Sequence, residues 1–101
     1  MKKILAILES TKLDNRVRLG IMSVLVVNDW VEFKTLKEML ELSDGNLASH
    51  LKVLEREKYI EIRKQFVGRK PQTTYRVTQL GRTAFENHLN ALEELIKRKG
   101  G

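Results

Sequence analysis

The chain has 101 residues, of which 42% are hydrophobic and 32% charged, and its formal net charge is +6. Such values are typical of one globular domain. Because the chain has no Cys, disulfides, thiolate catalysis and Cys-based zinc sites are excluded. The apolar stretch Ile4–Leu8 is too short for a signal peptide, and nothing approaches the ~20 apolar residues of a membrane span. We therefore expect a single cytoplasmic domain over residues 1–101.

The first half of the chain predicts four helices, because apolar residues recur at helical spacing and short polar residues stand where helices would begin. The expected helices run over Lys2–Ser10, from Asp14 or Asn15 to about Val27, over Lys34–Leu40, and from Ser43 or Asp44 to about Glu57. Trp30–Phe33 would add one short edge strand. Only Glu41-Leu42-Ser43 separates the last two helices, and so tight a connection is typical of a helix-turn-helix.

After Lys58 the apolar period changes from 3.6 to 2, which indicates strands. Tyr59–Phe66 and Thr73–Val77 predict a β-hairpin around the loop Val67–Gln72, which holds a glycine and the only proline. Thr78 can then cap a final helix that ends at about Lys97. The predicted fold is mainly α with a small β-hairpin, a winged helix-turn-helix of the α+β class.

The surplus of positive charge lies in this second half. Residues 62–85 contain six basic side chains and no acidic one, whereas the rest of the chain balances 13 basic against 13 acidic side chains. A local patch of this kind attracts a polyanion, and phosphate backbones are the commonest polyanion a domain meets. The six basic residues are Arg63, Lys64, Arg69, Lys70, Arg76 and Arg82.

The helix after the tight turn has two unlike faces. Leu47, Leu51 and Leu54 form one stripe, which we expect to be buried. The opposite face is small or polar with no acidic residue at its centre, so it can meet base edges and phosphates. Gly45 would let the backbone approach a phosphate at a helix end that favours anions. Such a face is common in proteins that bind nothing, but the tight turn before it and the basic hairpin after it favour DNA. The expected DNA-binding residues are Ser43, Asp44, Gly45, Asn46, Ser49, His50, Lys52, Val53 and Arg56 in this helix, and Arg63, Lys64, Arg69, Lys70 and Arg76 in the hairpin.

Several stretches carry motifs that occur together: Asp14–Met22, Phe33–Lys37, Leu42–Glu55, Tyr59–Ile60, Gly68–Thr78 and Gly81–Phe85. With SDGNLASHLKVLE from Ser43 and GRKPQTTY from Gly68, the chain resembles the small winged helix-turn-helix transcriptional regulators related to MarR and ArsR. The resemblance implies a DNA-binding regulator that is typically a homodimer. It also implies that the DNA-facing helix includes Asn46, Ser49, His50 and Lys52, and that the wing includes Arg69 and Lys70.

The metal-sensing ArsR branch needs Cys or clustered His ligands, and here only His50 and His88 are present. We therefore expect no metal site and no cofactor.

The terminal helices carry more apolar residues than one domain needs to cover itself. In the last helix Phe85, Leu89, Leu92 and Ile96 lie on one line, with a second apolar line beside it. We expect segments 1–12 and 78–98 to be dimerisation elements across a two-fold axis. The alternative is that the two helices pack on each other within one monomer. The expected interface residues are Ile4, Leu5, Leu8, Leu89, Leu92, Leu95 and Ile96.

The expected function is a homodimeric, sequence-specific regulator of transcription that binds double-stranded DNA, with helix 44–57 in the major groove and the wing, residues 66–73, on the backbone or in the minor groove. The alternative is a winged-helix interaction module of a larger transcription or sorting complex, whose basic patch meets an acidic protein. An enzyme is not expected, because the chain lacks a catalytic carboxylate pair, a nucleophile–base arrangement and a phosphate-binding glycine loop. The sequence identifies no membrane partner, effector, operator or target gene.

Overall fold

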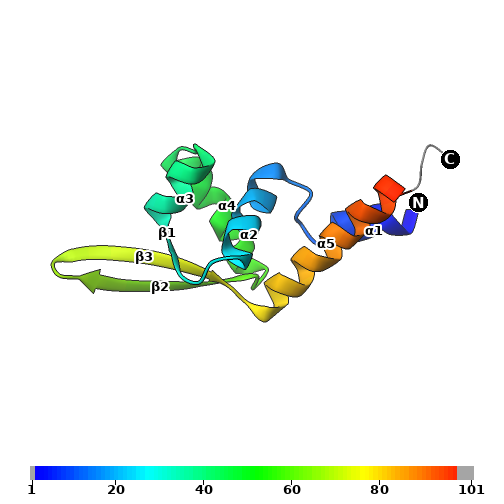
Figure 1. The fold of residues 1–101 in the computed structure, drawn as a ribbon. Helices are drawn as coiled ribbons and strands as arrows, with labels where there is room; N and C mark the ends of the chain where they lie inside the picture. Colours follow the sequence, from blue (N-terminus) through cyan, green and yellow to red (C-terminus); the bar gives the residue numbers. More distant parts are fainter. Residues whose placement is uncertain (1, 98–101) are drawn as a thin grey trace.

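The computed structural model describes residues 2–97, which form five helices and one three-stranded antiparallel sheet (Figure 1). This is the predicted winged helix-turn-helix. Positions 1 and 98–101 lie outside the described residues. The predicted dimerisation segments 1–12 and 78–98 each include one of these positions. The helices are α1 (Lys2–Ser10), α2 (Arg16–Val26), α3 (Phe33–Leu40), α4 (Asp44–Arg56) and α5 (Gln79–Lys97), and the strands are β1 (Val31–Glu32), β2 (Ile60–Val67) and β3 (Lys70–Val77).

Short polar side chains define the helix starts, as the sequence predicts. The Asn15 side-chain oxygen accepts hydrogen bonds from the backbone N–H groups of Val17 (2.9 Å) and Arg18 (3.2 Å), and so begins α2. The Ser43 hydroxyl accepts from the Asn46 N–H at 3.2 Å, and the Thr78 hydroxyl from the Gly81 N–H at 2.9 Å. Each cap satisfies a donor that the first helical turn leaves unpaired.

The hairpin is longer than predicted. β2 continues to Val67 and β3 begins at Lys70, so the loop predicted over 67–72 is a two-residue turn at Gly68 and Arg69. Gly68 has a φ of +65°, the conformation that a glycine at the first central position of a tight hairpin turn adopts readily. Pro71 lies inside β3, opposite Phe66. β1 pairs only with Tyr75 and Thr74, so β3 is an edge strand at Pro71, where a missing N–H is tolerated.

The core lies where α2, α4 and the base of the hairpin meet. The buried stripe of α4, Leu47, Leu51 and Leu54, is at most 2% exposed and packs in one cluster with side chains of α2 and the sheet. This confirms the stripe that the helical period predicts. Burial of these three leucines contributes about 1.5–3 kcal/mol each to the free energy of unfolding.

Two parts project from this core in opposite directions, the hairpin on one side and a terminal arm, α1 packed against α5, on the other (Figure 1). In this arm the facing sides of α1 and α5 pack on each other within one chain, as the alternative to a dimer predicted. Ile4 and Ala91 are buried between them, and the Thr11 hydroxyl lies 2.9 Å from Nδ1 of the buried His88. Leu5, Leu89 and Ile96 remain exposed.

Candidate nucleic-acid interface

The residues of α4 that were predicted to lie opposite the leucine stripe do point away from the core. We call it the reading face; it consists of Gly45, Asn46, Ser49, Lys52, Val53 and Arg56. Val53 is partly exposed and the other five are exposed, while His50 lies at the border and is partly buried. The side chain of Asn46 makes no hydrogen bond to another described residue, so its amide is free for a ligand. The Ser43 hydroxyl and the Asp44 carboxylate are engaged at the start of the helix, the first as the cap and the second in an ion pair with Lys37 at 2.9 Å.

Gly45 is not required by the fold. Its φ lies outside the left-handed region, and an added Cβ would meet no atom within 4 Å. A helical glycine without a conformational or steric reason costs about 0.5–1 kcal/mol relative to alanine. Close approach of a ligand to the backbone at this helix end would account for it.

His50 has a partner that the sequence did not predict. The Arg18 guanidinium lies with Nη1 3.4 Å from His50 Nδ1, while its Nε donates to the Lys12 carbonyl at 2.8 Å. Burial and then the charge of Arg18 lower the pKa of His50 below its ordinary value. The only sequence signal for this contact is that both residues belong to the motifs shared with known regulators.

The cations of the hairpin divide between two faces of the sheet. Residues paired directly across two strands share a face, and Ile62, Tyr75 and Val77 point into the core. Arg63 and Arg76 therefore point to the opposite, outer face. There their guanidinium carbons stack on the Trp30 ring, 4.3 and 4.5 Å from its centre.

The six basic residues of segment 62–85 are therefore not all available to a ligand. Arg76 also pairs with Glu61 at 3.0 Å, and Arg82 donates to the Val26 carbonyl at 3.1 Å. Lys64, Arg69 and Lys70 are exposed and have no ion pair with another described residue. These three, with Lys52 and Arg56 of α4, are the predicted basic residues that the structure leaves available to an anion.

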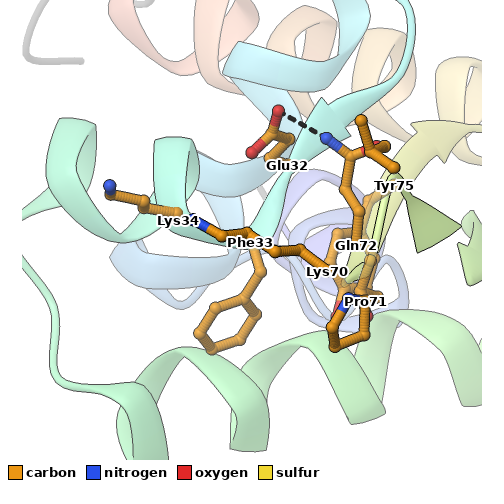
Figure 2. A pocket seen from close by; sticks show the side chains of 9 residues that line it. Glu32, Phe33, Lys34, Lys70, Pro71, Gln72 and Tyr75 are labelled. Atoms are coloured by element: carbon orange, nitrogen blue, oxygen red, sulfur yellow. Dashed lines mark hydrogen bonds between the residues drawn. The ribbon is translucent and has the colours of Figure 1, made fainter. Parts of the chain in front are cut away.

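The wing is tied to the helix-turn-helix at its base. A groove of about 630 Å³ lies between the start of α3 and the wing, with Phe33 and Lys34 on one side and Lys70 and Pro71 on the other (Figure 2). Across it the Gln72 amide donates to Glu32 Oε1 at 2.7 Å, drawn as a dashed line in Figure 2. This contact fixes the base of the wing relative to α3.

Tyr75 connects the hairpin to both helices of the helix-turn-helix. Its ring lies 6.5 Å from that of Phe33, centre to centre. Burial raises the pKa of Tyr75, and the Glu55 carboxylate of α4 raises it further. The base of the hairpin and the carboxyl end of α4 are therefore neighbours, as a winged helix-turn-helix requires.

Among residues 2–97, no group of three or more His, Asp or Glu side chains could hold a metal ion. No described helix is long and apolar enough to cross a membrane.

Known proteins share this architecture. A family model described as a winged helix DNA-binding domain matches residues 17–96. An uncharacterized protein of Methanocaldococcus jannaschii is 38% identical over 81 residues, which are 80% of this chain and 88% of that protein. The solved structure of a transcriptional regulator homologue from Pyrococcus horikoshii OT3 is 33% identical, with a TM-score of 0.86 and 96% of both chains covered. The YusO protein from Bacillus subtilis shares the fold, with a TM-score of 0.76 at 16% identity over 96% of this chain and 70% of that one.

Proposed function

The chain belongs to the winged helix DNA-binding domain family and is of the DNA-binding regulator type, and we propose that it reads sequence in double-stranded DNA to regulate transcription. In this proposal α4 enters the major groove and the wing lies on the backbone or in the minor groove. A cytoplasmic location, where the chromosome is accessible, belongs to the same proposal.

The observation that supports this proposal best is the reading face of α4. It is exposed, uncharged at its centre and bordered by cations at its carboxyl end, and its Asn46 amide has no partner among the described residues. An Asn side chain can bond the donor and acceptor of an adenine edge, and a Val can contact a thymine methyl. Lys52 and Arg56 would meet the flanking phosphates.

The available cations of the hairpin support the second half of the proposal. Arg69 occupies the turn of the wing and Lys70 follows it, so both are presented at the tip of a projecting hairpin (Figure 1). Roughly eight to ten phosphate contacts per dimer would make the logarithm of affinity fall with that of salt concentration at a slope of about −7 to −9.

A homodimer formed through the terminal arm is part of the proposal. α1 and α5 run antiparallel (Figure 1), and Ile7 and Asn87 line a groove on one side of their contact. The other side is the leucine side, made of Leu5, Leu8, Leu89, Leu92 and Ile96. Ile96 is 79% exposed and Leu5 is 54% exposed, which leaves apolar area for a second copy to bury. Two predicted interface residues are left out of this proposed surface. Ile4 is buried within the protomer, and the partly buried Leu95 lies on the line of α5 that also holds the buried His88 and Ala91.

Sedimentation equilibrium would test the dimer. We expect Ile96→Glu to give a monomer whose affinity for DNA falls, while Asn90→Glu on α5, away from the leucine side, leaves the dimer intact. A wild-type chain that sediments as a monomer at the concentrations where it binds DNA would contradict a dimeric binding unit.

The experiment that tests the function is the selection of bound fragments from the source genome, followed by titration of one selected duplex and a scrambled duplex. We expect Arg69→Gln to weaken both duplexes alike and to reduce the salt slope by about 0.9 per lost phosphate contact. Arg63→Gln is the matched control, because it removes the same charge from the outer face. Failure to bind any fragment at low salt, with co-purification of an acidic protein, would instead support the alternative of a protein-interaction module.

A further inference from the structure

We propose that Arg18 is a positioning residue that holds the His50 imidazole so that its Nε2–H donates to an acceptor atom of duplex DNA. The acceptor is a phosphate oxygen or a base edge, and the inference rests on the proposed function. Arg18 lies on α2, outside the helix-turn-helix, so it would act on DNA recognition only through its neighbour.

The chemistry of the two side chains determines the direction of the contact. A guanidinium has only donors and stays protonated, so Nη1 of Arg18 must be the donor to His50 Nδ1, 3.4 Å away. An Nδ1 that accepts carries no proton. The neutral ring then carries its single proton on Nε2, because the hydrogen bond at one ring nitrogen determines the state of the other.

Arg18 is itself held by two further hydrogen bonds. Its Nε donates to the backbone carbonyl of Lys12 at 2.8 Å, and Lys12 stands in the connection between α1 and α2 with a φ of 63°. The backbone N–H of Arg18 is fixed by the Asn15 cap at 3.2 Å. The guanidinium therefore has a defined position from which it can orient the ring.

The surroundings of His50 favour its neutral form. Arg18 is the charged group that α2 places against the ring, and the positions one turn away on α4 are uncharged, namely Asn46, Leu47, Val53 and Leu54. Protonation of Nδ1 would set two donors and two positive charges against each other. Burial and then the charge of Arg18 lower the pKa of His50, which agrees with this geometry. At neutral pH the imidazole would contribute a directional donor and no charge.

The position of His50 on α4 gives that donor a target. At 100° per residue, Asn46 and Val53 fall on the same side of the helix as His50, and these two belong to the reading face. The partly exposed ring would therefore extend the reading face by one hydrogen-bond donor at its border.

A double-mutant cycle with Arg18→Met and His50→Phe tests the inference. We expect each single variant to lose about tenfold in affinity for the selected duplex, and the double variant to lose no more than either single one. The salt slope should not change, because no phosphate loses a cation. Losses that add, or a slope reduced by Arg18→Met, would show that Arg18 contacts DNA directly and would overturn the proposal.

Arg18→Lys separates position from charge. It keeps the charge but cannot donate to Lys12 and His50 in the same planar arrangement, so we expect it to behave like Arg18→Met. Full rescue by Lys would overturn the positioning role. Equal losses on selected and scrambled duplexes would identify a phosphate oxygen as the acceptor, and a loss that depends on one base pair would identify a base edge.

Ring-nitrogen NMR of the free protein distinguishes failure of this inference from failure of the proposed function. It should show His50 protonated at Nε2 only, with a pKa that rises in Arg18→Met. A ring protonated at Nδ1 would overturn the inference even if the protein binds DNA. If no duplex binds the wild-type chain, the proposed function fails whatever the state of the ring.

Discussion

Replacing Gly45 by alanine should raise the stability of the fold and lower the affinity for DNA. The structure gives the first effect directly. Gly45 lies in the first turn of α4, has no positive φ and leaves open space for a Cβ. Alanine in a helix is favoured over glycine by about 0.5–1 kcal/mol. For a domain of about this size, 1 kcal/mol shifts the melting temperature by about 4–8 °C, so we expect a rise of about 2–8 °C.

The second effect follows from the proposed interface. If the backbone at Gly45 approaches a phosphate at the amino end of α4, a methyl group there holds the phosphate away from the helix N–H groups. A hydrogen bond to a charged group is worth about 1.5–3 kcal/mol, so affinity should fall about tenfold or more.

Thermal unfolding and a duplex titration on the same preparation measure both effects. Because the two quantities are expected to move in opposite directions, loss of folded protein cannot explain the loss of binding. A variant that is more stable and binds as tightly as the wild type would refute the close approach at Gly45. A less stable variant would refute the structural argument instead.

Three further predictions concern separate parts of the molecule. Asn46→Ala should reduce affinity for the selected duplex while the melting temperature stays within a degree or two, since the side chain has no partner among the described residues; a large fall in melting temperature would contradict this. Burial lowers the pKa of His88, and the opposing effect of Asp14 is weaker, so the folded state favours the neutral ring. Its contribution to stability is then fully present above the unfolded pKa of about 6.5 and is lost as pH falls below it, so the melting temperature should fall between about pH 6.5 and 5, less steeply in His88→Gln. Equal slopes in the two proteins would rule out His88 as the titrating group. Gly81→Ala should destabilise the fold by about 2–3 kcal/mol, because the new Cβ would overlap the carbonyl oxygen of Tyr59 and lie 2.9 Å from the carbonyl carbon. Chemical denaturation measures this loss, and an unchanged midpoint would show that the backbone relaxes to admit the methyl group.

The sequence alone was sufficient for the elements, their order and the two faces of α4. These depend on local rules: apolar residues recur with the period of each element, and polar side chains at Asn15, Ser43 and Thr78 cap the helices that follow them. The error in the wing has a local cause as well. Pro71 suggested a loop, but an edge strand tolerates a proline, so the strands continue to a two-residue turn.

Only the tertiary structure decided which charged and polar groups are available. Counting cations along the chain could not show that Arg63 and Arg76 stack on Trp30, because that contact depends on the strand register and on a residue from the connection between α2 and β1. The same holds for Arg18 against His50 and for Gln72 against Glu32, pairs 32 and 40 positions apart. Helical and strand periods specify which face a residue occupies, whereas the partner it meets there is determined by how the elements pack.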